Sequence, residues 1–224
     1  MNQTVVQPVK RRNPAGTRKR ILAAAKAEFA RNGLMGARVD VIARRAKTNK
    51  QMLYHYFGNK EALFTATLED AWSDIRSAEE EIDFDKLAPI EALKAHVAFT
   101  WNYYLEHPEF LTLVSSENLH EARHLKSSER FRDINQPFVT RMRALLARGA
   151  AAGLFRTGID PVQVHITIAA IGYYYLTNRF TGSIVFERDL MAKATLDERL
   201  AFNISTILRL VLTPRALARI EAVA

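Results

Sequence analysis

Residues 39–57 read VDVIARRAKTNKQMLYHYF. The apolar residues of the first half recur at helical spacing, and a polar break at residues 47–49 follows them. The second half has an apolar side made of Leu53, Tyr56 and Phe57. It has a polar side made of Lys50, Gln51 and Tyr54. We therefore expect two short helices, at about 39–46 and 50–57, joined by a tight turn.

Two helices of this size joined by three residues are typical of a helix-turn-helix. Such a unit places its second helix in the major groove of DNA, where side chains near the helix start reach the base edges. Lys50 is suited to guanine and Gln51 to adenine, while Tyr54 on the same face can contact a phosphate or a base. Lys60 begins the next helix, where a cation beside exposed N–H groups favours phosphate binding.

The charge distribution supports a polyanion as partner of the N-terminal part. Residues 1–60 carry 14 Lys and Arg against 2 Asp and Glu, a net charge of +12. The other 164 residues carry 18 basic and 22 acidic side chains, a net charge of −4. Nucleic acid and an anionic membrane surface both fit a basic module. Residues 1–20 are polar and do not resemble a signal peptide, and the uncharged segment 161–178 contains too many polar residues for a membrane span.

Helical periodicity continues through the rest of the chain, which contains no convincing alternating strand. We expect an all-α fold of about nine helices, with Thr17 as the N-cap of the first helix. The expected helices span residues 17–32, 39–46, 50–57, 60–82, 89–106, 108–119, 129–152, 161–181 and 196–213. The expected organisation is a flexible basic arm at 1–14, a three-helix DNA-binding domain at 15–63 and a larger helical domain at 64–224.

Residues 18–63 resemble the DNA-binding domain of TetR-family transcriptional regulators. The resemblance rests on the run LYHYFGNKEAL at residues 53–63 and on the preceding pattern of Phe29, Gly33 and GARVDVIA at 36–43. It implies that Lys50, Gln51 and Tyr54 face the groove. It places the remaining candidates at backbone or flanking contacts or at the start of the reading helix. The full set of expected DNA-binding residues is Arg38, Thr48, Asn49, Lys50, Gln51, Met52, Tyr54, His55 and Lys60.

Two positions depart from the family pattern. Ala37 and Arg38 stand where the family commonly has threonine, so we expect the second helix to lack a hydroxyl cap and Arg38 to contact phosphate instead. Lys47 replaces a glycine that commonly relieves backbone strain at a positive φ, so the family pattern does not predict the geometry of this turn.

The same resemblance implies that the acidic body pairs two subunits and holds a small effector. We expect a homodimer through the broadly apolar helices at about 161–181 and 196–213. The body is similar around Glu117 and at residues 153–161 to the subgroup of the pyrimidine-utilisation regulator, which implies a catabolic effector. Core packing is the alternative for each candidate pocket residue. The candidates are Trp101, Tyr104, Phe110, Glu117, Phe138, Met142, Tyr173, Tyr174 and Asn178.

The predicted function is a cytoplasmic, nucleoid-associated repressor that binds an operator in double-stranded DNA and is released by a small-molecule effector. An architectural, nonspecific DNA-binding protein with an inert dimer body is the alternative. An enzyme is disfavoured because no nucleophile triad, phosphate loop or HExxH motif is present. We expect no cofactor and no metal, because His120 and His124 lack a third ligand at suitable spacing and the chain has no cysteine.

Overall fold

The structure is a computed structural model that describes residues 14–222. The described residues form eleven helices and no strand, and an isolated bridge pairs Phe155 with Leu212. This confirms the all-α prediction and corrects the expected number of nine helices. The longest uninterrupted apolar stretches among these helices are too short or too polar to cross a bilayer. The predicted basic arm lies outside the described residues except for Pro14, the first residue of α1.

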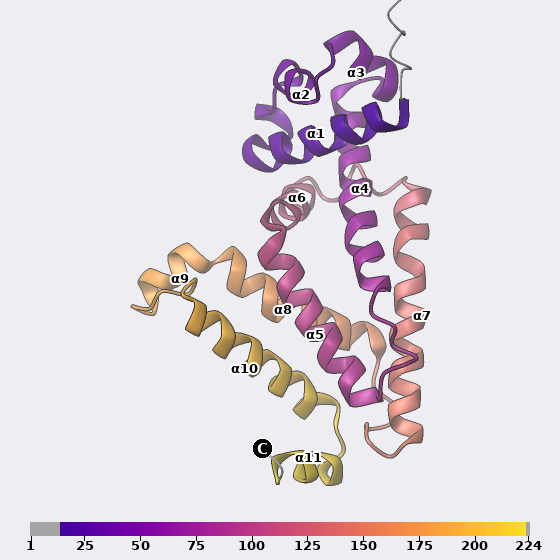
Figure 1. The fold of residues 1–224 in the computed structure, drawn as a ribbon, viewed down its shortest axis with the longest axis vertical. Coiled ribbons are helices and arrows are strands. Elements are labelled where there is room, and N and C mark those ends of the chain that lie inside the picture. Colours follow the sequence, from indigo (N-terminus) through magenta and orange to yellow (C-terminus); the bar gives the residue numbers. More distant parts are fainter. Residues whose placement is uncertain (1–13, 223–224) are drawn as a thin grey trace, which may run out of the picture. The chain divides into compact units, whose positions relative to one another are not determined.

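The chain divides into two compact units between Thr67 and Leu68, within helix α4. The first unit contains α1 (Pro14–Gly36), α2 (Val39–Arg45), α3 (Lys50–Phe57) and the start of α4 (Lys60–Glu80), labelled in Figure 1. Its core forms where the apolar stripes of these helices meet: Phe29 and Phe64 are fully buried, with ring centroids 5.0 Å apart. Leu53 and Phe57 also lie in this core, as predicted, whereas Tyr56 is half-buried.

A buried carboxylate joins α1 to α2 in the first unit. Glu28 is 3% exposed, and its Oε1 accepts hydrogen bonds from the Asn32 side chain at 2.9 Å and from the backbone N–H of Arg38 at 3.2 Å. Its Oε2 accepts one from Arg45 at 3.2 Å. Because the carboxylate is paired and hydrogen-bonded, its burial is tolerated. Glu28 therefore fixes where α2 begins and ends relative to α1.

The second unit contains the rest of α4 and seven further helices. They are α5 (Pro89–Glu106), α6 (Pro108–Leu119), α7 (Glu129–Ala151), α8 (Pro161–Thr177), α9 (Arg179–Val185), α10 (Lys193–Val211) and α11 (Pro214–Glu221). Helix α5 packs against α7, α8 and α10 (Figure 1). The core contains fully buried side chains from α5, α7 and α10, among them Leu93, Met142 and Ile207.

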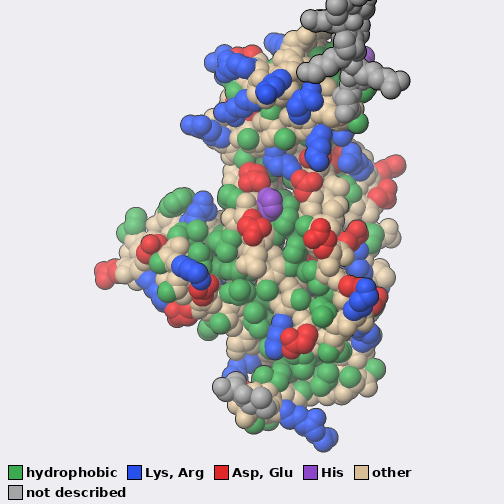
Figure 2. Space-filling view, in the orientation of Figure 1, with side chains coloured by type: hydrophobic (Ala, Val, Ile, Leu, Met, Phe, Trp, Pro, Cys, Tyr) green, Lys and Arg blue, Asp and Glu red, His purple; other side chains and the backbone are tan. Residues whose placement is uncertain are grey.

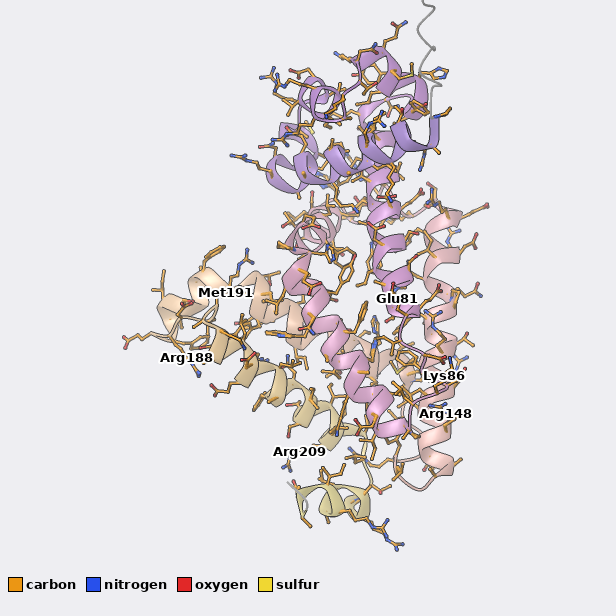
Figure 3. All side chains as sticks on the ribbon, in the orientation of Figure 1. Glu81, Lys86, Arg148, Arg188, Met191 and Arg209 are labelled. Atoms are coloured by element: carbon orange, nitrogen blue, oxygen red, sulfur yellow. The ribbon has the colours of Figure 1, made fainter. Side chains whose placement is uncertain are left out.

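Two contacts hold the C-terminal end of α7. Arg148 donates hydrogen bonds to the carbonyl oxygens of Phe84, Asp85 and Leu87 at 2.6–3.0 Å, and Figure 3 shows it beside this connection between α4 and α5. At the other contact, the Phe155 ring lies directly against Gly149, where an added Cβ would come within 1.9 Å of the ring. These contacts hold the connections that precede α5 and follow α7.

Several helix boundaries differ from those expected. Helix α1 begins at Pro14 rather than after a Thr17 cap, because proline needs no N–H partner in a first turn. The expected helix at 161–181 is two helices, α8 and α9, because the chain leaves helical geometry at Asn178. Helix α10 begins at Lys193 rather than residue 196, after a residue without a side-chain cap. Helix α11 was not expected, although its cap Thr213 and its first-turn proline are ordinary start signals.

Candidate functional site

The turn between α2 and α3 sets the position of the candidate reading helix. Lys47 adopts a φ of 53°, so the turn keeps a left-handed conformation at the position where the family commonly has glycine. The following Asn49 caps α3, since its side chain accepts a hydrogen bond from the backbone N–H of Met52 at 2.7 Å. Arg20 on α1 donates to the carbonyl oxygen of Ala46 at 3.2 Å. The turn is therefore held from both sides.

Helix α3 has one buried and one exposed side. Lys50, Gln51, Tyr54 and His55 are exposed, and Met52 is half-buried. The Lys50 ammonium lies 5.6 Å from the centroid of the Tyr54 ring, so the two side chains share a face. The side predicted to meet DNA is therefore accessible, and contact with DNA stays a prediction.

The flanking candidates have partners within the first unit. Arg38 pairs with Asp40 at 3.0 Å, and its hydrogen bonds hold the pKa of that carboxyl below its ordinary value. Helix α2 has no side-chain cap at Arg38, as predicted. The Lys60 ammonium donates to the carbonyl oxygen of Met35 at 3.1 Å, and Thr48 is half-buried. Figure 2 shows many Lys and Arg side chains on the visible face of the first unit.

The second unit contains a cavity of about 480 Å³ walled by α4, α5, α6 and α8. This size lies within the range of small-molecule sites, ~300–1,000 Å³. Three of the predicted pocket residues, Tyr104, Phe110 and Tyr173, line it. The Tyr173 hydroxyl is hydrogen-bonded to Ser115, which ties α8 to α6.

The other predicted pocket residues lie elsewhere. Trp101, Phe138 and Met142 are buried, and none of the three lines the cavity, because they face neighbouring helices of the core. Tyr174 is 65% exposed, one position round α8 from Tyr173. Together with Asn178 it lines a separate surface pocket beside α9. These five residues therefore lie outside the cavity formed by α4, α5, α6 and α8.

Glu117 is also corrected, because it holds a loop instead of lining the cavity. Its Oε1 accepts from the backbone N–H groups of His124 and Leu125 at 2.8 and 3.2 Å. Its Oε2 lies 2.6 Å from the imidazole Nδ1 of His124. Within residues 14–222 no group of three His, Cys, Asp or Glu side chains could hold a metal ion.

A buried polar cluster on the cavity wall was missed by the sequence analysis. Arg76 and Glu79 are 7% and 2% exposed, and Arg76 Nη1 lies 2.6 Å from Glu79 Oε2. Arg76 Nε donates to Asn135 Oδ1 on α7 at 3.1 Å. Burial raises the pKa of Glu79, and Arg76 opposes that shift. The i, i+3 spacing of the pair is visible in the sequence, but its burial depends on residues far along the chain.

Two histidines lie within this cluster. Burial lowers the pKa of His96 to about 3, and the neighbouring His165 and Arg76 add to the shift. Burial likewise lowers the pKa of His165 to about 4, again with a contribution from Arg76. Both imidazoles are therefore neutral at pH 7. The Nδ1 of His165, which lines the cavity, has no hydrogen-bond partner among the described residues.

The two units match two parts of one family. Residues 21–67 match the family described as "Bacterial regulatory proteins, tetR family", and residues 89–207 match "Tetracyclin repressor-like, C-terminal domain". The chain belongs to the TetR family. TetR-family regulators bind DNA operators and small-molecule effectors and form dimers, and the chain is accordingly a ligand-responsive, DNA-binding transcriptional regulator.

Two relatives that are named as transcriptional regulators support membership of the TetR family. The chain is 38% identical over 193 residues to the "HTH-type transcriptional repressor NicS" of Pseudomonas putida, covering 86% of this chain and 91% of that one. It is 29% identical to the "HTH-type transcriptional regulator RutR" of Escherichia coli, covering 91% and 92%. Both names describe transcriptional regulators and not enzymes.

Solved structures agree with the fold. The crystal structure of the putative transcriptional regulator SCO4942 from Streptomyces coelicolor has a TM-score of 0.66 and 26% identity, covering 87% of this chain and 98% of that one. A TetR-family regulator from Marinobacter aquaeolei has a TM-score of 0.68 at 19% identity, covering 88% and 96%, a likeness of fold.

Proposed function

We propose that the protein represses transcription by binding an operator through α3 and that an effector in the cavity of the second unit releases it. The observation that carries the proposal is the exposed polar side of α3, opposite a side buried in the core. A helix in this arrangement presents its first turns to the major groove while its fold stays intact. The same partner, DNA, would place the protein on the nucleoid in the cytoplasm.

The residues of the first unit have different proposed roles. Lys50, Gln51 and Tyr54 share the exposed face and are proposed to contact bases or the adjacent backbone. The proposed backbone and flanking contacts are those of Arg38, Thr48, Met52, His55 and Lys60. Asn49 is proposed to act by capping α3, since its side-chain Oδ1 already accepts a hydrogen bond from the backbone N–H of Met52.

We propose a homodimer through α8, with its continuation α9, and α10. These helices expose large apolar side chains that a monomer would leave in water: Val162, Ile166, Tyr174, Phe180, Ile184 and Phe202. Figure 2 shows hydrophobic side chains on the part of the second unit that carries α9 and α10. Pairing about a twofold axis would bury these side chains. It would also supply two copies of α3, which can read two operator half-sites one DNA turn apart, ~34 Å.

The proposed release of DNA is a shift between two states. Helix α4 contributes Trp72, Ile75 and Arg76 to the cavity wall and begins at Lys60 in the first unit. An effector that binds one arrangement of α4 better than another therefore changes the population of the DNA-binding state. A useful switch requires a difference of a few kcal/mol, about 1–3 for a typical coupling.

The test begins with selection of bound sequences from random DNA by the full-length protein. Fluorescence anisotropy then compares the selected DNA with scrambled DNA as competitor. We expect the selected sequence to contain two related half-sites and to bind at least about 10³-fold more tightly than scrambled DNA. Equal competition by scrambled DNA would instead indicate the nonspecific architectural protein.

Tyr54→Ala is expected to abolish binding to the selected DNA, because it removes a side chain from the centre of the exposed face of α3. Tyr54 is not part of the core, so the circular dichroism spectrum and the dimer should be unchanged. Tyr103→Phe on α5 is the control, since it removes a hydroxyl far from α3 in sequence and should leave DNA affinity unchanged. Full retention of DNA binding by Tyr54→Ala would contradict the proposal that this side of α3 faces the major groove.

A further inference from the structure

The cavity wall presents a buried cation with unused hydrogen-bonding capacity. Arg76 Nε donates to Asn135 and Arg76 Nη1 donates to Glu79, but Nη2 has no acceptor among residues 14–222. The side chain is 7% exposed and lines the cavity. A guanidinium carries five N–H donors, and an unsatisfied donor in a buried site is costly. An acceptor from a ligand would satisfy it.

The charges around this end of the cavity do not balance. Arg76 and Arg141 both approach the single carboxylate of Glu79, with N···O distances of 2.6 and 3.6 Å. Arg141 also pairs with Glu80, but that carboxylate is 60% exposed and screened by water. The two nearby histidines are neutral at pH 7. Two guanidinium groups therefore share one buried carboxylate, an arrangement that favours an anionic ligand over a cationic one.

Tyr104 offers a second donor beside Arg76. It is 8% exposed and lines the cavity. Burial raises its pKa to about 12, an effect that the charge of Arg76 on the same cavity wall opposes. The hydroxyl stays protonated at neutral pH and is available to donate to an anion.

The rest of the cavity wall combines aromatic and small aliphatic side chains. The rings of Trp72 and Phe110 meet edge to face at 5.2 Å, and Tyr104 stacks with Phe110 at 6.1 Å. Ala169 and Ala170 of α8 line the wall with small side chains, which leaves space for a flat group. Aromatic walls of this kind favour a planar ring, which can adopt offset-stacked or edge-to-face contacts.

We propose that the cavity binds a small aromatic carboxylate, with its ring among Trp72, Tyr104 and Phe110 and its carboxylate accepting hydrogen bonds from Arg76 Nη2 and the Tyr104 hydroxyl. The proposal rests on the proposed function and names the chemical class of the effector. Glu79 sets the strength of binding, because its charge attracts the guanidinium and repels the ligand. Arg76 and Glu79 therefore act on an anionic ligand with opposite sign.

The test uses isothermal titration of the protein with three aromatic probes of similar size, benzoate, benzamide and benzylammonium, and with acetate, a carboxylate without the ring. Benzoate is expected to bind at least about tenfold more tightly than benzamide, the size of one charge-assisted hydrogen bond. Benzylammonium and acetate are expected to bind more weakly still, because one has the wrong charge and the other lacks the ring. Benzamide binding as tightly as benzoate would overturn the proposal.

Two variants test the assigned roles. Arg76→Gln is expected to remove the preference for benzoate, while Glu79→Gln, which keeps the shape of the side chain, is expected to increase it. Arg143→Gln is the control, since Arg143 is an exposed residue of α7 that does not line the cavity. If both residues had only a structural role, the two substitutions would change the affinity for benzoate in the same direction. That result would overturn the assignment. If Arg76→Gln does not fold, Glu79→Gln decides, and an unchanged or lower benzoate affinity counts against the proposal.

DNA release is measured separately, so that the two proposals can fail independently. Benzoate binding in the expected pattern without release of DNA at saturation would support the ligand class and contradict the effector mechanism. Release of DNA by a neutral aromatic compound that binds better than benzoate would support the mechanism and contradict the ligand class. Absence of any benzoate binding overturns the ligand class.

Discussion

Lys47 shows how a single residue stores strain beside a functional surface. Its φ of 53° is a conformation that glycine adopts freely and that costs a residue with a Cβ roughly 1–2 kcal/mol. The residue is exposed, so its side chain gains little from packing in return. The strain is accepted at the turn that positions α3, next to Thr48 and Asn49. A lysine in this place adds positive charge near the proposed DNA contacts.

Lys47→Gly is expected to stabilise the first unit by about 0.5–1 kcal/mol, because relief of the left-handed strain exceeds the extra entropy of the unfolded chain. Lys47→Ala removes the same charge but keeps the Cβ, and it should give no such gain. Amide hydrogen exchange in α2 and α3 of the full-length protein measures the difference. Equal stability of the two variants would show that the turn is unstrained.

Residue patterns predicted the sides of α3 but not the buried polar pairs. Leu53 and Phe57 could be assigned to the core because their spacing fits one face of a helix. Glu28 and Arg76 could not be recognised, because a buried charge depends on partners brought from elsewhere in the chain. Arg76, for example, contacts Asn135, 59 residues away. No local pattern contains that information.

At the level of elements, α3 depends on its cap. The helix has eight residues, which is too short to be stable on its own in water. The Asn49 side chain satisfies one of the orphan N–H groups of its first turn. The cap thereby supports the helix that presents Lys50, Gln51 and Tyr54.

Asn49→Ala is expected to destabilise the first unit by about 1 kcal/mol, and Asn49→Asp or Asn49→Ser to cost much less, because those side chains can also cap. Thermal unfolding of the full-length protein without DNA, followed with hydrogen exchange in α3, measures the effect. Asn102→Ala, at an exposed position on α5, serves as the control. A loss equal for alanine and serine would mean that the cap is not the cause.

Element boundaries were predictable where the start signals were single and strong. Asp160 caps α8 and Asn59 caps the first turn of α4, and both are residue types typical of helix starts. The break at Asn178 was not predictable, because the apolar pattern continues across it and the change is one of backbone geometry. Helix α11 was not predicted despite its cap, because its eight residues are too few to show a clear helical periodicity of apolar residues.

For the whole molecule, the uneven charge predicts a strong dependence of DNA affinity on salt. Binding that neutralises about six to ten phosphates per dimer gives a slope of log K against log salt of about −5 to −9. Lys60→Gln should reduce the slope by about one per subunit. Lys193→Gln, an exposed lysine at the start of α10, should leave it unchanged. Affinity independent of salt would contradict an electrostatic interface.

The buried histidines predict a loss of stability in acid. Because burial lowers the pKa of His96 to about 3, the unfolded chain binds a proton near pH 6.5 that the folded chain does not. The contribution of neutral His96 to the free energy of unfolding is therefore fully present above pH 6.5. Below pH 6.5 it decreases by up to ~1.4 kcal/mol per pH unit. His165 acts in the same direction, and Glu79, whose pKa is raised, acts in the opposite one.

Chemical denaturation between pH 7 and pH 5 measures this dependence in the second unit. His96→Gln should give a shallower decrease in the free energy of unfolding than the parent protein, whatever its stability at pH 7. His120→Gln, at a half-buried histidine outside the cluster, should keep the parent slope. Identical slopes for all three proteins would assign the acid sensitivity to other groups.

In the proposed homodimer, the apolar side chains on α8, α9 and α10 also link assembly to survival in the cell. A newly made subunit would display Phe180, Ile184 and Phe202 until it meets another copy. In that interval it is a substrate for chaperones and proteases, which recognise such surfaces. By mass action, the fraction of paired subunits rises with the concentration of the protein. Subunits are therefore degraded faster when the protein is scarce than when it is abundant. A lower limit on abundance is thereby built into the surface of the molecule.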